Sequence, residues 1–156
     1  MTDLILDETG RAGGVGESGA SALVVLSCTP GLSVTELGRR VGLSQSAAAR
    51  MVDGLETAAL VERRAGVGRT VSVHPTRRGR RAAHRLLAAR SQPLTDVMQT
   101  LDEGEQRTLT DLLEKLLDGL YDRVGNADLL CRLCDRAVCI ADATCPVGAA
   151  ERARDR

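Results

Sequence analysis

The sequence is almost without aromatic residues: its 156 residues include no Phe, no Trp and a single Tyr, Tyr121. The core must therefore be built from Leu, Val, Ala and Met, without the large apolar area that aromatic side chains bury. Proteins that bind RNA or single strands stack the bases on exposed aromatic side chains. The lack of such side chains therefore favours duplex DNA over RNA as a nucleic-acid partner.

Long apolar runs are also missing. No stretch reaches the roughly 18 residues of a membrane helix, and no charged-then-apolar leader precedes a cleavage site. We therefore expect a cytoplasmic protein without a membrane partner. Thiols stay reduced in that compartment, so the five cysteines indicate metal or redox chemistry and not a disulfide framework.

The chain has no net charge, but the charges are distributed unevenly along it. Twelve arginines and only four acidic residues lie between Glu36 and Arg90, which gives this block a net charge of +8 and leaves −8 for the remainder. Phosphate contacts depend on local charge, so the block is the electrostatic footprint of a nucleic-acid-binding surface. For Arg77 to Arg90 alone, solvation of a helix face explains the arginines equally well.

Residues Ser33 to His74 indicate two capped helices and a hairpin. Ser33 and Glu36 have capping-box spacing, and Ser44 is suited to cap a second helix after Gly42. Four apolar residues share one face of that second helix: Ala48, Met51, Val52 and Leu55. Two β-prone runs around a glycine-containing loop follow, with arginines on the loop and its shoulders. A helix-turn-helix with an arginine-bearing wing is a surface that docks on DNA.

The second helix is expected to enter the major groove, where Arg and Gln side chains contact guanine and adenine edges. The wing arginines are expected to meet phosphate or the adjacent minor groove, unless one of them pairs with Asp53 or Glu62 and holds the wing in place. The predicted DNA-binding residues are Ser33, Thr35, Ser44, Gln45, Ser46, Ala49, Arg50, Arg63, Arg64 and Arg69. Two copies would read half-sites about 10 bp apart.

Three further helices are expected around this unit. The apolar run from Ala20 to Cys28 predicts a helix packed beneath it, with Cys28 buried in the core. Thr76 is suited to cap a long basic helix, which Pro93 would kink or split. Asp102 begins a second capping box, ahead of a terminal amphipathic helix.

The terminal helix carries a wide leucine stripe: Leu109, Leu112, Leu113, Leu116, Leu117 and Leu120. One small domain does not need so wide a stripe to cover its core. Left alone it would expose a large apolar patch to water, so we expect the same stripe of a second copy to cover it. The alternative is that the stripe packs only on its own chain.

Four cysteines then fall within fifteen residues, spaced C-x2-C-x4-C-x5-C: Cys131, Cys134, Cys139 and Cys145. Four thiolates suit a closed structural zinc site with sulfur–zinc distances of about 2.3 Å, although the usual second C-x2-C pair is missing. An iron–sulfur cluster also takes four cysteines. Thiol–disulfide switching without a cofactor, and unligated thiols in a disordered tail, are the remaining interpretations. We favour zinc.

In this order, the segments resemble the MarR family of bacterial winged-helix regulators. The resemblance covers Ser18 to Val124 and is carried by Ser33 to Arg50, Leu55 to Arg64 and Arg77 to Arg80. It implies a homodimer that binds a pseudo-palindromic operator, usually as a repressor, and a DNA affinity that in many members falls with a small-molecule effector or an oxidant. The cysteine-rich end is similar to that of a subset of the family.

The expected fold is therefore mainly α with a small β-wing, a winged helix-turn-helix with N- and C-terminal dimerisation helices. We assign residues 1–19 to an N-terminal arm, 20–90 to the DNA-binding domain, 91–127 to the dimerisation region and 128–156 to the cysteine-rich tail. The expected function is that of a homodimeric transcription regulator with a metal- or redox-linked cysteine cluster. The alternative is a metal-dependent protein-interaction module with secondary DNA binding. We do not expect an enzyme, because no nucleophile–base spacing surrounds His74 or His84.

Overall fold

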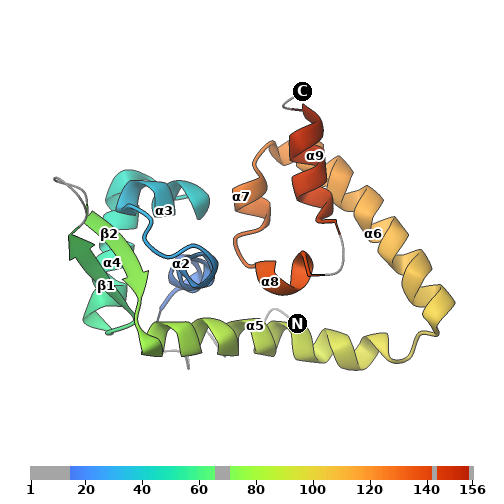
Figure 1. Cartoon of the computed structure of the whole chain (residues 1–156), viewed down its shortest axis with the longest axis horizontal. Coiled ribbons are helices and arrows are strands. Elements are labelled where there is room, and N and C mark those ends of the chain that lie inside the picture. The colour runs from blue at the N-terminus through green and yellow to red at the C-terminus, as the bar shows by residue number, and fades with distance from the viewer. Residues whose placement is uncertain (1–14, 66–70, 142–143, 155–156) are drawn as a thin grey trace.

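The computed structural model describes residues 15–65, 71–141 and 144–154, and all statements about the fold concern these residues. The elements follow in the order α2 (Glu17–Cys28), α3 (Val34–Arg40), α4 (Gln45–Thr57), β1 (Val61–Ala65), β2 (Val71–Pro75), α5 (Arg77–Met98), α6 (Glu103–Val124), α7 (Ala127–Leu130), α8 (Arg136–Cys139) and α9 (Pro146–Arg154) (Figure 1). The predicted fold class, mainly helical with a two-stranded wing, is confirmed.

Side-chain caps begin the helices where the sequence predicts them. The hydroxyls of Ser33, Ser44 and Thr76 each accept a hydrogen bond from the backbone N–H three residues further on, at the starts of α3, α4 and α5. At α6 the capping box is complete, since Asp102 accepts from the backbone N–H of Glu105 and the Glu105 side chain accepts from that of Asp102. Local sequence therefore determines where these four helices begin.

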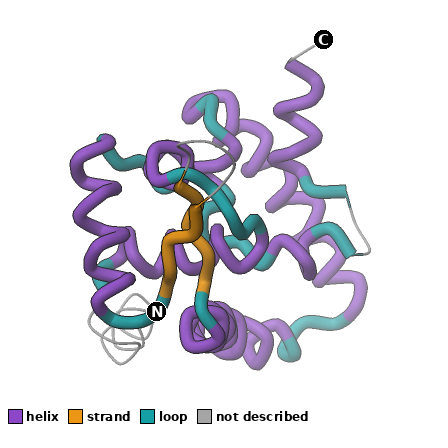
Figure 2. The backbone as a smooth tube through the Cα atoms, turned by 60° about the vertical axis from the view of Figure 1, so that its left-hand side comes forward, coloured by secondary structure: helices purple, strands orange, loops and turns teal. Residues whose placement is uncertain are grey.

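The wing is a single antiparallel strand pair, β1 with β2, in which Arg63 lies opposite Val73. Leu32, just before α3, bridges Val73 and so ties the hairpin to the helix-turn-helix. Figure 2 shows the two strands in orange among the helices of the winged unit, of which α2, α3, α4 and α5 contact them. The loop between the strands, residues 66–70 with the predicted DNA contact Arg69, lies outside the described residues.

The main core lies between α2, α3, α4, the wing and the first half of α5. It consists of small aliphatic side chains: Ala22, Leu23, Leu26, Leu37, Val41, Val52, Leu55, Leu60, Val61, Val73, Ala82 and Ala83. The predicted helix beneath the helix-turn-helix is α2, and its Leu23 and Leu26 are fully buried. Its last residue, Cys28, is exposed, so the prediction of a core position is wrong: the helix ends there and the side chain projects beyond the core.

α5 leads out of the winged unit as one helix of 22 residues. Pro93 lies inside this helix and does not split it, because one missing backbone hydrogen bond is a local cost within a long helix. α6 runs back at an angle, α7 reaches α3, and α9 lies beside α6, so that α5, α6 and the tail outline a triangle (Figure 1). No helix in the described part of the chain is long and apolar enough to cross a membrane.

A second, much smaller core lies where α9 packs on α6. Its buried members are Tyr121, Val147 and Ala150. Five partly buried side chains surround them: Leu117, Ala127, Leu130, Cys131 and Cys145. The single aromatic residue of the chain thus anchors the tail and not the main core.

Candidate nucleic-acid interface

The recognition helix α4 presents a polar face on the side opposite to its buried face. Gln45, Ser46 and Arg50 are exposed, and Ala49 is half-buried beside them. The Ser44 hydroxyl caps the helix and lies 3.4 Å from the Ser46 hydroxyl. These residues are therefore available to a groove at the first turns of α4, and their contact with DNA stays a prediction.

The start of α3 contributes two more of the predicted contacts, Ser33 and Thr35, both exposed. The Ser33 hydroxyl accepts a hydrogen bond from the Glu36 backbone N–H at 3.1 Å. The first helix of a helix-turn-helix crosses the DNA backbone, where small hydroxyls reach phosphate oxygens. Ser33 thus already has a structural role as a cap, whereas the side chain of Thr35 is simply exposed.

Arg63 of the wing is held between two carboxylates of α4. Its guanidinium donates to Asp53 at 2.6 Å and also to Glu56, and the hydrogen bond to Asp53 raises the pKa of Arg63. Of the two roles that the sequence left open for a wing arginine, this is the bracing role. Arg64 pairs with Glu62 on the same strand, with 2.8 Å between Nε and Oε1, and its exposed side chain remains near the surface.

Three other arginines of the basic block have no acidic partner among the residues that the structure describes. Arg50 on α4 and Arg77 and Arg78 at the start of α5 are exposed, and in the described ranges no ion pair engages them. Arg77 and Arg78 follow directly on β2 of the wing. The set of predicted contacts did not include these two, although their place in the basic block could have indicated them.

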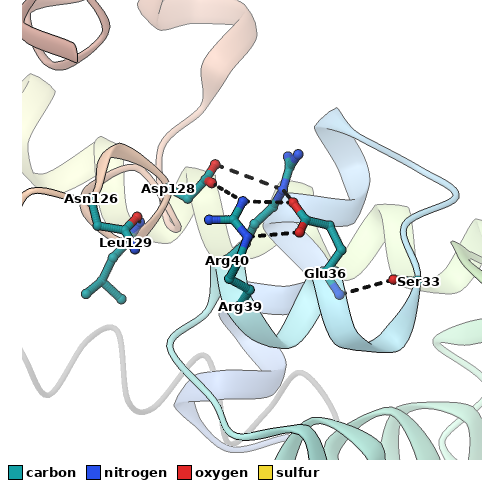
Figure 3. Close-up of polar contacts among 7 residues, drawn as sticks. All are labelled: Ser33, Glu36, Arg39, Arg40, Asn126, Asp128 and Leu129. Carbon is teal, nitrogen blue, oxygen red and sulfur yellow. Dashed lines mark hydrogen bonds and ion pairs between the residues drawn. The ribbon is translucent and has the colours of Figure 1, made fainter. Parts of the chain in front are cut away.

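A network of charges at the end of α3 was not predicted (Figure 3). The Glu36 carboxylate accepts from Arg39 at 2.9 Å and from Arg40 at 2.8 Å, and Asp128 of α7 accepts from Arg39 at 2.7 Å. The two guanidinium groups, Arg39 first, lower the pKa of Glu36 to about 2. The Glu36 side chain therefore does not complete the predicted capping box. No sequence pattern indicates the link to Asp128, which lies 89 residues from Arg39.

α7 also packs on the turn that precedes the recognition helix. Gly42 in this turn has a φ of +75°, and a Cβ there would lie 3.0 Å from Leu129 Cδ1. The Asn126 side chain fixes Leu129 by accepting from its backbone N–H at 3.0 Å. The tail is therefore in direct contact with the helix-turn-helix (Figure 3).

The four cysteines of the tail come together as half-buried free thiols. Burial first, and then the neighbouring Cys145 and Cys139, raise the pKa of Cys131 to about 11. Burial and the neighbouring Cys134 and Cys145 likewise raise the pKa of Cys139. Such protonated thiols are the opposite of the low-pKa thiolate that a redox sensor needs. Among the residues described, no three His, Cys, Asp or Glu side chains are arranged around one point as metal ligands, so zinc stays a prediction.

Comparison with known proteins points to one family. The model of the MarR family matches residues 18–68. The MarR family protein Rv2887 of Mycobacterium tuberculosis, in complex with salicylic acid, is 33% identical with a TM-score of 0.50, and the match covers 70% of this chain and 85% of that one.

Two structures of lower identity share the fold. Rv1404 of Mycobacterium tuberculosis is 20% identical with a TM-score of 0.65, over 80% of this chain and 84% of that one. FabT of Streptococcus pneumoniae, in complex with DNA, is 17% identical with a TM-score of 0.65, over 78% and 89%. No curated protein matches the chain.

Proposed function

The chain belongs to the MarR family of transcription regulators, and from this premise we propose that it is a homodimeric repressor that binds a pseudo-palindromic operator in duplex DNA. The observation that carries the proposal is the exposed polar face of α4 together with exposed arginines that pair with no carboxylate of the described residues, in a chain whose net charge is zero. We propose repression and not activation because members of the family usually act as repressors. Membership in a family of regulators also supports the expectation that the chain is not an enzyme.

The recognition helix is held in a fixed position. The Ser44 side chain accepts a hydrogen bond from a backbone N–H of its first turn, and the apolar face of the helix packs in the main core. Its exposed side chains could therefore contact bases without any rearrangement of the helix. Arg63 ties the wing to α4 through Asp53, which keeps the two DNA-facing elements in one orientation. In the complex that we propose, Gln45 and Arg50 reach base edges, and Arg77 and the wing contact phosphates.

The leucine stripe of α6 supports the dimer. Within one chain Leu112 keeps 52% and Leu116 68% of their surface exposed, and Leu113 and Leu120 are also exposed. A second copy that places its own α6 on this stripe would remove the apolar patch from water. The two recognition helices would then face successive major grooves on one side of the duplex.

A small aromatic acid is the effector that we propose for the groove between α5 and α8, which has a volume of 680 Å³. Leu87, Leu94 and Met98 give the groove an apolar wall, and Arg90, Asp135 and the cysteines Cys134 and Cys139 also line it. The apolar wall would hold an aromatic ring, and Arg90 would pair with a carboxylate on that ring. Rv2887, whose structure contains salicylic acid, is the relative that supports this ligand class.

The DNA proposal is tested by fluorescence anisotropy with a duplex from the chain's own promoter and a scrambled duplex. The wild type should prefer the promoter duplex, and Arg50→Ala should weaken that binding by about tenfold to a hundredfold, because a bidentate base contact contributes about 1–3 kcal/mol. Arg107→Ala is the matched control, since Arg107 lies on α6 and pairs with Glu103. Equal affinity of wild type for both duplexes at low salt would contradict the proposal.

A further inference from the structure

We propose that Cys131, Cys134, Cys139 and Cys145 form a four-thiolate site for a thiophilic metal, as a zinc ion or an iron–sulfur cluster, and that the loaded site holds the tail as a strut between α6 and α3. The effect on DNA affinity rests on the proposed function. The existence of the site does not, because it is argued from the tail alone.

The thiols come from three separate parts of the tail. Cys131 and Cys134 share a tight turn after α7, in which the Cys134 N–H donates to the Cys131 carbonyl at 2.9 Å. Cys139 ends α8, and Cys145 precedes α9. Cys131 and Cys145 pack against the same small core, and Cys134 and Cys139 line the same groove. The Cys145 sulfur accepts from the Gly148 N–H at 3.4 Å. Backbone N–H groups that donate to sulfur are a usual feature of metal–thiolate sites.

The tail has too small a core to be held by apolar packing alone. Of its described residues only Val147 and Ala150 are buried, both against Tyr121 of α6. α7 and α8 have four residues each, far below the length at which a helix is stable by itself. Segments of this size often need a disulfide, a metal or a partner chain to become ordered. In the reducing cytoplasm that the sequence predicts, four clustered cysteines favour the metal.

The donor set fits a thiophilic metal, since the tail supplies four cysteine thiols, which bind such metals as thiolates. Among the described residues, no three potential ligands surround one point. We therefore expect the tail to rearrange on loading, since metal binding and the last step of folding are coupled in small sites. Leu117 and Leu130 pack beside the thiols and limit the access of water.

One end of the strut is attached to the helix-turn-helix. Asp128 accepts from Arg39 at 2.7 Å and lies 4.0 Å from Arg40 (Figure 3). Leu129 lies against the turn at Gly42, where a Cβ would be 3.0 Å from its Cδ1. Two contacts with other elements add to these: Arg132 pairs with Glu17 of α2, and Arg90 of α5 donates to the Leu133 carbonyl. In the sequence, the first two cysteines thus follow within a few residues of Asp128 and Leu129, which contact α3 and the turn before α4.

The other end is attached to α6, the proposed dimer helix. Val147 and Ala150 of α9 pack on Tyr121, and Arg154 pairs with Asp122. Without the strut, α5 alone connects the winged unit to α6 (Figure 1). A loaded site therefore fixes the angle between the two, and in a dimer this angle sets the separation of the recognition helices. Loss of the metal should lower operator affinity by about fivefold or more, the usual scale of coupling between sites.

The first experiment measures metal content and visible absorption of the full chain purified anaerobically under reducing conditions. We expect either one zinc per chain without visible absorption, or iron and sulfide with the broad visible absorption of a cluster. Cys134→Ser and Cys139→Ser should each lower the metal content, whereas Cys28→Ser, which removes the thiol on α2, should not. Metal-free wild-type protein that acquires neither metal on reconstitution would overturn the proposal.

The second experiment separates this inference from the proposed function. In the loaded protein, hydrogen exchange should show protection across residues 126–139, and a chelator should remove it together with operator affinity. Asp128→Asn should keep the metal, lose protection at the end of α3 and bind the operator more weakly. Unchanged protection and unchanged operator affinity after metal removal would overturn the strut while the regulator proposal stands. If the metal-loaded protein binds no duplex, the regulator proposal is wrong. The metal site then stands or falls with the metal content per chain measured in the first experiment.

Discussion

At the scale of single residues, two helical glycines of the winged unit differ sharply in the space around them. Gly79 is buried near the start of α5, and a Cβ there would lie 1.9 Å from the carbonyl oxygen of Leu60. Gly54 is exposed on α4, and a Cβ there would meet nothing within 4 Å. The close approach of α5 to the backbone before the wing therefore requires a residue without a side chain at position 79.

Gly79→Ala should consequently destabilise the fold by about 1–3 kcal/mol or more, the usual cost of overpacking, since the atom that a methyl group meets is backbone. Gly54→Ala is the matched control and should raise stability by up to about 1 kcal/mol, because alanine loses less entropy in a helix. Urea unfolding of both variants measures the free energies. Equal stability of the two variants would contradict the packing described for α5.

The same scale shows what the sequence can and cannot predict about residues. The caps at Ser44 and Asp102 were predictable because each involves a backbone group at most three residues away. The bracing of Arg63 by Asp53 was named only as one of two options, since its geometry depends on how the wing folds back on α4. The pair Arg39–Asp128 was out of reach, because it joins segments that only the tertiary fold brings together.

At the scale of elements, α6 carries apolar side chains that its own chain leaves exposed to solvent. Its apolar stripe is largely in water, while Tyr121 near its end is buried under the tail. The periodicity of the leucines predicted the helix itself, but not the tail that covers its last turns. Likewise the sequence could place Pro93 in a long helix without deciding whether that helix continues.

Replacing Leu112 and Leu116 together by Gln should convert the proposed dimer to monomers, because the burial of both apolar side chains against a second copy would be lost. The matched control replaces Asp111 and Lys115 by Gln, which keeps the spacing, the helix and the net charge while leaving the stripe intact. Light scattering after size exclusion gives the mass of each. A wild-type monomer, or a double leucine variant that remains dimeric, would show that α6 is not the dimer helix.

At the scale of the whole molecule, the net charge of zero conceals a strongly basic block that makes up about a third of the chain. The twelve arginines between residues 36 and 90 are partly neutralised by Glu36, Asp53, Glu56 and Glu62, as the ion pairs of Arg39, Arg40, Arg63 and Arg64 show. The arginines at the start of α5, Arg77 and Arg78, form no ion pair with any of the described residues. Composition could locate the basic block, but only the structure separates arginines that brace the fold from arginines that are free to meet phosphate.

Binding to the operator should therefore depend steeply on salt, with affinity falling about a thousandfold or more between 50 and 200 mM if the dimer contacts six or more phosphates. Replacing Arg77 and Arg78 together by Ala should make this dependence shallower, since fewer counterions are released. Replacing Arg63 by Ala should instead act mainly on stability and wing orientation. Anisotropy titrations at several salt concentrations give the slopes. An Arg77/Arg78 variant with the wild-type slope would remove α5 from the interface.

The triangular arrangement has a consequence for how this chain can change over time. Each residue inserted into a helix lengthens it by about 1.5 Å and turns everything beyond it by about 100°. A single insertion in α6 would therefore swing Asp128 away from Arg39 and leave Gly42 uncovered. Insertions and deletions in α6 should thus survive only with compensating changes in the tail, so that helix length and tail sequence evolve as one trait.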